Sequence, residues 1–313
     1  MPPEISVSGL AKSFGKYSIL EDISFEINAG EVYGLVGLNG AGKTTLIRLL
    51  IGVLKADRGL ISVLGKDPWS HDASLHRRMG VVIEHDGFWG NLSFEQNMKI
   101  FAAAKSIVWS SAFGYIEDFW DRTGLYRNKK AVKFFSRGQR MQCALCRAFM
   151  GWPSVYFFDE PAVALDVDAY DHFTTMVKRA RDNGAAVVIS SHQLDAIDDL
   201  CDRVGMLHDK RLAELSPKKE SGGQWSLETD RNETWAAIIK AVCTADPVYR
   251  DGEWQFEVQN AAKAIPMLVK RLVEAGCSIG KIAPAPGEFS DTIRNEYRRK
   301  SGLLSVQKGT ANP

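Results

Sequence analysis

Apolar and polar residues change their spacing several times along this chain. Through the first two thirds, short strand-like runs, several of them continuously apolar, alternate with runs of 3-to-4 spacing. Continuous apolar runs are typical of strands in a sheet covered on both faces, and 3-to-4 spacing is typical of helices. The strand-like runs are residues 24–27, 32–36, 81–83, 155–158 and 186–190. The pattern therefore predicts an α/β domain over residues 1–215.

The middle of this region shows helical spacing alone. It predicts a helical insert at about residues 91–150, most clearly over 91–133. An amphipathic helix on a membrane surface is the alternative, but these stretches lack a face rich in Lys and Arg, so a packed helical lobe is favoured. The apolar positions of the pattern are Phe94, Met98, Ile100, Phe101, Phe113, Ile116, Phe119 and Trp120.

A different organisation follows residue 215. The polar segment 216–224, S-P-K-K-E-S-G-G-Q, predicts a linker. Beyond it, strand and helix patterns predict a small α+β accessory domain over residues 225–300, and residues 301–313 are expected to form a flexible tail. The expected strands are 225–228, 253–258 and 278–283, and the expected helices are 234–242, 261–275 and 289–299.

Composition narrows the possible partners. With 39 basic and 38 acidic side chains there is no overall field to attract nucleic acid or an anionic bilayer, although a local patch stays possible. No run approaches the roughly 18 apolar residues that span a bilayer, and the N-terminus lacks the pattern of a secretory signal. We therefore expect no nucleic-acid partner, and any role at a membrane requires a separate subunit.

Cysteine usage points to reduced thiols. Five cysteines are an odd number in a long chain, which fits the cytosol better than a disulfide framework. Cys143 and Cys146 form a C-x-x-C, but they lie in the helix-like run 139–150 without a second ligand pair nearby. Core packing is therefore favoured over metal or redox chemistry.

Residues 37–44 read G-L-N-G-A-G-K-T and match the phosphate-binding loop G-x-x-x-x-G-K-[ST]. The loop follows a strand-like run and precedes a helical run, which is the context that such a loop requires. Its backbone N–H groups can surround phosphates, Lys43 can reach the β- and γ-phosphates, and the Thr44 hydroxyl can bind Mg²⁺. The residues predicted to bind ATP here are Gly37, Asn39, Gly40, Ala41, Gly42, Lys43, Thr44 and Thr45.

A second strand supplies carboxylates. The apolar run 155–158 ends at Asp159 and Glu160. An acidic turn after a core strand would explain this pattern by itself, but a phosphate loop in the same chain favours a catalytic interpretation. We expect Asp159 to bind Mg²⁺ and Glu160 to act as the general base for water, with Lys43 as a further catalytic group.

These motifs, in this order, resemble the nucleotide-binding subunits of ATP-binding cassette (ABC) transporters over residues 1 to about 215. The resemblance implies that Phe14 stacks on adenine, although a buried strand residue is the alternative. It also implies that Ser136, Gly138 and Gln139, within the signature segment 135–139 (F-S-R-G-Q), bind the ATP held by a second subunit. Arg137 departs from the family's glycine, and this charge can either assist the phosphate or crowd it.

Other positions match the family in the same way. The resemblance implies that His192 is the switch histidine at the γ-phosphate and that Glu84 is a third Mg²⁺ ligand in place of the usual Gln. The segment Ala164, Leu165 and Asp166 resembles the loop that contacts the partner subunit. Residues 221–224 repeat the end of the signature, but they lie in the predicted linker before a strand and are rejected as a site.

The pair Phe88 and Trp89 after Glu84 resembles the ATPases of bacitracin- and lantibiotic-type drug or peptide exporters. Their side chains are either core residues or a groove for a permease helix; the groove is weakly favoured. The resemblance implies a P-loop ATPase that uses ATP and Mg²⁺, pairs with a second copy and drives an integral-membrane permease at the cytoplasmic face of the membrane. A regulatory or degenerate half of a heterodimer, or a soluble ABC protein outside transport, is the alternative.

Overall fold

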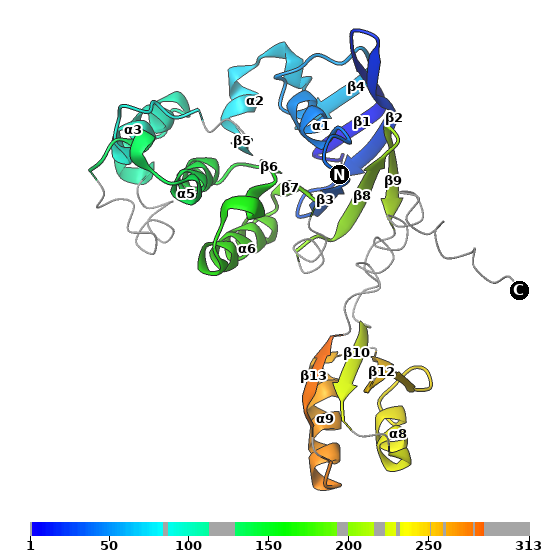
Figure 1. The fold of residues 1–313 in the computed structure, drawn as a ribbon. Coiled ribbons are helices and arrows are strands. Elements are labelled where there is room, and N and C mark those ends of the chain that lie inside the picture. The colour runs from blue at the N-terminus through cyan, green and yellow to red at the C-terminus, as the bar shows by residue number, and fades with distance from the viewer. Residues whose placement is uncertain are drawn as a thin grey trace, which may run out of the picture. The chain divides into compact units, whose positions relative to one another are not determined.

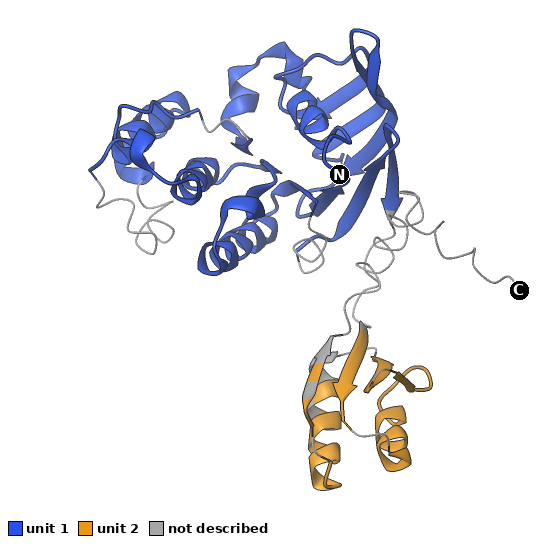
Figure 2. Cartoon of the chain, in the orientation of Figure 1, with its two compact units in different colours: residues 1–217 blue, residues 218–313 orange. Residues whose placement is uncertain are grey.

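The computed structural model describes residues 2–83, 87–112, 129–192, 200–215, 223–229, 232–250, 252–258, 261–277 and 279–284. The chain divides into two compact units, Met1–Pro217 and Lys218–Pro313 (Figure 2). No helix among the described residues is long and apolar enough to cross a bilayer.

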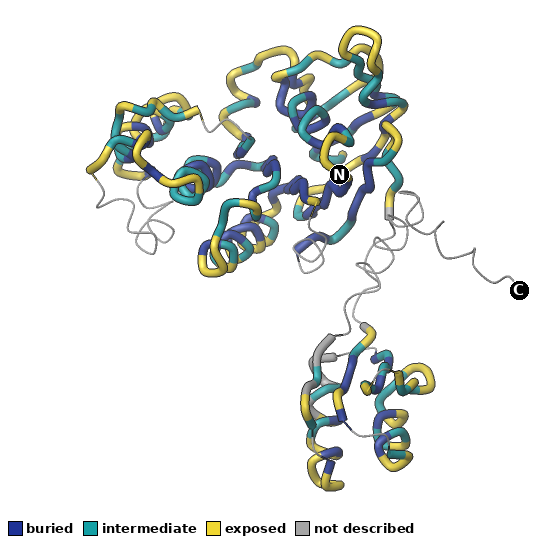
Figure 3. Tube along the Cα trace, in the orientation of Figure 1, coloured by how far each residue is buried: buried dark blue, intermediate teal, exposed yellow. Residues whose placement is uncertain are grey.

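A six-stranded sheet forms the centre of unit 1. Its order is β5-β6-β7-β3-β8-β9, with neighbours parallel except β9, which runs antiparallel to β8. Every residue of β3, β6 and β7 is buried, as their continuous apolar runs predicted (Figure 3). The strands are β3 (Val32–Val36), β5 (Met79–Val82), β6 (Val155–Asp159), β7 (Ala186–Ser191), β8 (Arg203–His208) and β9 (Arg211–Leu215).

A three-stranded antiparallel sheet lies beside it, in the order β2-β1-β4. Its strands are β1 (Ile5–Phe14), β2 (Tyr17–Ile27) and β4 (Arg58–Val63). The sequence pattern identified only the end of β2. One hydrophobic core joins residues of both sheets to α1 (Lys43–Leu50), which buries Leu46, Ile47, Leu49 and Leu50.

The predicted helical insert is present as far as it is described. It contains α3 (Phe94–Ala104), the 3-10 turn η3 (Val132–Phe134) and α5 (Arg137–Phe149). Figure 1 shows α3 and α5 at the end of unit 1 opposite β1, β2 and β4. The predicted positions Phe113, Ile116, Phe119 and Trp120 lie outside the described residues.

The described residues of unit 1 also contain the short turn η1 (Pro68–Ser70) and three further helical elements. They are α2 (Ala73–Arg77), η4 (Pro161–Ala164) and α6 (Val167–Asp182). The two cysteines of the C-x-x-C are both fully buried in α5, and none of the five cysteines, all of which are described, is in a disulfide. Packing therefore accounts for Cys143 and Cys146, as expected.

The described residues of unit 2 form a four-stranded antiparallel sheet and two helices. Along the chain its order is β-α-β-β-α-β, and across the sheet it is β11-β12-β10-β13. This strand order is that of the ferredoxin-like split β-α-β arrangement. Its elements are β10 (Gly223–Glu228), α8 (Glu233–Lys240), β11 (Val248–Arg250), β12 (Glu253–Val258), α9 (Ala261–Glu274) and β13 (Lys281–Pro284).

Two boundaries in unit 2 differ from the sequence expectation. β10 begins at Gly223 and so includes the last two residues of the segment predicted as a linker. β13 begins at Lys281, three residues after the predicted start. The helix predicted at 289–299 lies outside the described residues. The core of the unit gathers Leu227, Ile239, Trp254, Phe256, Val258, Leu268 and Leu272 from the strands and from both helices.

Candidate functional site

The phosphate loop connects β3 to the first turn of α1. Gly42 precedes this helix with φ of 108°, a left-handed conformation that a residue with a side chain rarely adopts. No side chain caps the helix at this end. The N–H groups of the first turn have no partner within a helix, so they are available to an anion. The loop therefore fits the phosphates of a nucleotide.

Lys43 is held inside the loop. Its Nζ donates hydrogen bonds to the carbonyl oxygens of Gly37 (2.8 Å) and Leu38 (3.3 Å), and it lies 3.2 Å from Glu160 Oε1. Only 5% of the residue is exposed. The loop thus concentrates a buried positive charge at the end of the central sheet.

Asp159 ends β6 with both carboxylate oxygens in use. Thr44 Oγ1 donates to Oδ2 at 2.6 Å, and Ser190 Oγ donates to Oδ1 at 2.6 Å. The structure therefore brings Thr44 and Asp159 together, two of the three residues predicted to bind Mg²⁺. The third, Glu84, lies outside the described residues.

Ser190 is a site residue that the sequence reasoning missed. It is fully buried at the end of β7, and its hydroxyl also accepts a hydrogen bond from Glu160 N at 3.0 Å. It therefore fixes the relative position of both acidic residues. The signal was present, since two serines end an otherwise apolar strand.

Glu160 follows β6 in an unusual backbone conformation. Its φ of 51° is left-handed, which is uncommon for a residue other than glycine and typical of functional positions. His192 contacts its carboxylate, with Nδ1 2.7 Å from Oε2, and the His192 backbone N–H donates to the same oxygen at 3.3 Å. Because β6 and β7 are parallel neighbours, their carboxyl ends place these two residues side by side.

The signature segment begins α5. Ser136 is the N-cap residue; its Oγ accepts from Gln139 N, and Gln139 Oε1 accepts from Ser136 N, which is a complete capping box. A Cβ added to Gly138 would lie 2.9 Å from the Ala164 carbonyl oxygen. The segment is thus held closely against η4. Asp166, from the predicted subunit-contact loop, caps α6 by accepting from Ala169 N.

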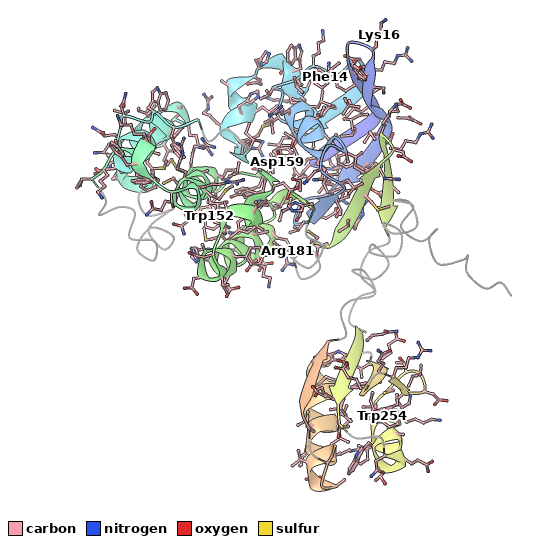
Figure 4. All side chains as sticks on the ribbon, in the orientation of Figure 1. Phe14, Lys16, Trp152, Asp159, Arg181 and Trp254 are labelled. Carbon is pink, nitrogen blue, oxygen red and sulfur yellow. The ribbon has the colours of Figure 1, made fainter. Side chains whose placement is uncertain are left out.

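One cavity of about 1000 Å³ joins the phosphate loop to the signature segment. Figure 4 marks Asp159 in the interior of unit 1 and Phe14 toward one edge. Phe14 ends β1, is 48% exposed, and carries the Lys12 ammonium 5.5 Å from its ring centre. The polar residues around the cavity are Asn39, Thr44, Arg137, Arg140, Asp159, Glu160 and His192.

The donor set fits a hard divalent cation bound together with phosphates. A Thr hydroxyl and an Asp carboxylate already lie within hydrogen-bond distance, and oxygen donors of this kind suit Mg²⁺. No group of three His, Cys, Asp or Glu among the described residues forms a metal site by itself.

The two aromatic residues after Glu84 have different surroundings. Phe88 is half-buried, packs edge-on against Phe101, and lies under the guanidinium of Arg147 at 5.3 Å. Trp89 is 49% exposed while its ring centre lies 5.6 Å from that of Phe101. Phe88 therefore belongs to a small aromatic cluster, and Trp89 extends that cluster to the surface.

Comparisons with known proteins agree with this geometry. Residues 20–163 match the family model described as ABC transporter. The chain is 32% identical to the bacitracin transport ATP-binding protein BcrA of Bacillus licheniformis, over 68% of this chain and 69% of that protein. It is 29% identical to the uncharacterized ABC transporter ATP-binding protein YdbJ of Bacillus subtilis, over 94% of each chain. Among solved structures, an ATP-binding subunit of an ABC transporter aligns with a TM-score of 0.64 and 27% identity, over 68% of this chain and 89% of that one.

Proposed function

This chain belongs to the ABC transporter family, and we propose that it drives an exporter. Two copies of the chain close on ATP and hydrolyse it between them, and this closure moves a separate permease. The chain is an ABC-type ATPase with an α/β P-loop fold, as expected from its motifs. It is an ATP-binding subunit of the drug or peptide exporter kind. The proposal is carried by one observation: five predicted catalytic or binding residues lie together at the carboxyl ends of three parallel strands. They are Lys43, Thr44, Asp159, Glu160 and His192.

In the proposed reaction, Lys43 changes partners when ATP arrives. Its ammonium leaves the carbonyl oxygens of Gly37 and Leu38 and binds the β- and γ-phosphates instead. The same movement separates Lys43 from Glu160 and leaves that carboxylate to interact with water. Nucleotide binding and the release of the base are therefore one event.

Glu160 then acts as the general base. Water attacks the γ-phosphorus in line with the bond to ADP, the proton of the water passes to Glu160, and ADP leaves. His192 orients the carboxylate through its contact at Oε2 and approaches the γ-phosphate as the second copy closes. Thr44 and Asp159 would hold Mg²⁺, which supplies positive charge at the phosphate oxygens.

The surface around Trp89 is proposed as the contact with the permease. Nearly half of the surface of Trp89 is exposed. No helix among the described residues is long and apolar enough to span a membrane. An aromatic residue at the edge of a small cluster can receive an apolar helix from a partner. The chain would then act at the cytoplasmic face of the membrane, held there through the permease. BcrA is named for bacitracin transport, so we propose a related drug or peptide as cargo.

Glu160→Gln tests this proposal because it removes the base and keeps the size of the side chain. We expect ATP to bind as before, hydrolysis to fall by about a thousandfold, and a closed pair of chains to accumulate. Turnover by phosphate release and mass by light scattering measure these effects. Glu21→Gln, which affects an exposed ion pair with Lys210, is the matched control.

Turnover of Glu160→Gln at the parent rate would show that another group is the base. If the unmodified chain bound ATP but hydrolysed none, even with its permease, it would instead be a regulatory half of a heterodimer. Normal hydrolysis without pairing would favour an ABC protein that works outside transport.

A further inference from the structure

The hairpin formed by β1 and β2 carries two exposed aromatic rings at its end. Phe14 ends β1 and is 48% exposed, and Tyr17, its partner at the start of β2, is 79% exposed. Figure 4 marks Phe14 and the turn residue Lys16. Further along both strands the large apolar residues are buried in the core of unit 1. The hairpin therefore presents aromatic surface at its tip alone.

This tip lies close to the phosphate loop. A Cβ added to Gly42 would lie 3.1 Å from side-chain carbons of both Ile19 and Leu20, so β2 packs directly on the loop. Lys12 is opposite Leu20, and Phe14 lies two residues further along β1, roughly 7 Å away. Bases of nucleotides stack readily on exposed aromatic rings. The ring of Phe14 is thus within reach of the base of a nucleotide whose phosphates occupy the loop.

Asp57 takes the place of a strand beside the tip. The pairing between β1 and β4 ends with Ala11 opposite Arg58, and Asp57 N donates to the Ala11 carbonyl oxygen at 3.0 Å. The next N–H on this side of β1 is that of Ser13, which donates to Asp57 Oδ2 at 2.7 Å. One side chain therefore continues the hydrogen bonding of β1 up to the residue before Phe14.

The second carboxylate oxygen of Asp57 binds a cation beside the ring. Lys12 Nζ donates to Oδ1 at 2.8 Å, and it lies 5.5 Å from the ring centre of Phe14, within the range of a cation–π contact. The hydrogen bond from Lys12, followed by that from Ser13 N, lowers the pKa of Asp57 below its ordinary value. The carboxylate is therefore ionised at neutral pH and holds both groups at once.

We propose that Asp57 is a positioning residue for the nucleotide: it holds Phe14 where the base stacks, and so sets the affinity for ATP without touching it. This inference rests on the binding of ATP at the phosphate loop, which the proposed function requires. The pairing of β1 with β2 shifts register on both sides of Lys12, so that ladder alone does not fix the tip. A ring that is already in place loses less conformational freedom when the base binds.

The test compares two ligands on full-length chains. The first is the β,γ-imido analogue of ATP, which is not hydrolysed, and the second is inorganic tripolyphosphate, which has the phosphates but no base. Calorimetry with Mg²⁺ gives both affinities. Asp57→Asn keeps the size of the side chain and removes its charge. We expect it to weaken binding of the ATP analogue about tenfold, which is the size of one stacking contact, and to leave tripolyphosphate within about twofold.

Turnover gives a second readout that general damage to the fold would not produce. In Asp57→Asn the KM for ATP should rise about tenfold while kcat stays within about twofold, because Asp57 holds the base and not the reacting phosphate. Asp246→Asn is the matched control, since it removes the same charge from an exposed ion pair with Lys240 in unit 2. It should change neither ligand affinity nor KM.

A double substitution shows whether Asp57 acts through the ring. Phe14→Ala should weaken the ATP analogue at least as much as Asp57→Asn does, and the two changes together should cause little further loss. Phe14→Tyr keeps a ring, so the effect of Asp57→Asn should persist there. A full effect of Asp57→Asn in chains that lack the ring would overturn the inference. Equal weakening of both ligands, or no weakening of either, would do the same.

The parent chain separates this inference from the proposed function. If it bound tripolyphosphate as tightly as the ATP analogue, the hairpin would not hold the base, and the inference would be refuted while the phosphate loop kept its role. If it bound neither ligand, the proposed function itself would be refuted.

Discussion

Unit 1 and unit 2 place their polar groups very differently. In unit 1 the buried polar or charged residues include Lys43, Asp159 and Ser190, which meet at the ends of parallel strands. Among the described residues of unit 2, only Ser226 and Thr229 are both polar and buried. The core of unit 2 otherwise consists of apolar side chains. The contrast indicates that the reaction belongs to unit 1 and that unit 2 is held together by packing.

The backbone follows the same division. Every described non-glycine residue with a positive φ lies in unit 1, including Glu160, whereas Gly252 and Gly276 adopt such angles in unit 2. Unusual backbone conformations cost free energy and persist where the surrounding structure imposes them. Three substitutions test how completely chemistry and packing are separated between the units.

The largest effect is expected from Phe256→Ala in unit 2. Phe256 is 3% exposed in the core, and its loss should lower the free energy of unfolding of unit 2 by about 3–5 kcal/mol. Hydrogen exchange of β10 and β12 measures this loss. The affinity of unit 1 for ATP should stay within about twofold of the parent value. Gln255→Ala, on the opposite face of the same strand, is the control. A matching loss of ATP affinity would refute the separation.

Ser190→Ala should have a smaller effect that is confined to unit 1. The substitution leaves Asp159 Oδ1 without its buried partner, while Glu160 N keeps only its bond to the Ser190 carbonyl oxygen, so kcat should fall by about tenfold or more. ATP affinity should change little, because Ser190 does not contact the phosphate loop. Steady-state turnover gives kcat, and Ser8→Ala on an exposed position of β1 serves as the control. An unchanged kcat would show that Ser190 does not position the acids.

The smallest effect concerns pH. Lys105 is partly buried and donates to the carbonyl oxygens of Met79 and Met150, each at 3.2 Å. Desolvation, with a smaller contribution from Arg147, lowers its pKa from 10.5 to about 8. Below pH 8 the amine is charged in both folded and unfolded chains, and the folded chain carries the full cost of burying it.

As the pH rises through 8, the folded chain releases this proton before the unfolded chain does, so the free energy of unfolding should rise. Between pH 7.5 and 8.5 the gain from this group should be less than about 1 kcal/mol. Denaturant titrations of the parent and of Lys105→Met measure the difference. The two proteins should differ in the slope of stability against pH, and equal slopes would assign the titration to another group.

Sequence patterns identified the strands that are buried on both faces and missed several others. Continuous apolar runs mark β3, β6 and β7, so these strands can be identified without knowing which strands lie beside them. β1 pairs with register shifts, and its burial is uneven along the strand. β8 contains Gly205, where an added Cβ would clash with the Tyr33 hydroxyl. This glycine interrupts the apolar run of β8. The reason for the glycine is the close approach of Tyr33 on the neighbouring strand β3, which the sequence pattern does not show.

The site shows the same limit. The sequence predicted roles for Lys43, Thr44, Asp159 and Glu160 because each lies in or directly after a recognisable pattern. The role of Ser190 was not, because it depends on β6 and β7 being neighbours in the sheet. Likewise, the left-handed backbone at Glu160 is imposed by what surrounds the end of β6. Motifs thus identified the groups, and the order of strands determined their contacts.

The pairing of β10 with β13 has a mechanical consequence for unit 2. These strands are antiparallel neighbours, with Trp225 opposite Pro284 and Glu228 opposite Lys281. The first described strand of the unit therefore begins close to the point where its last described strand ends. Tension between those two points would load the hydrogen bonds of this pair one after another, as in opening a zipper. Unit 2 should thus open under a much weaker pull than a sheet whose strands must slide past each other.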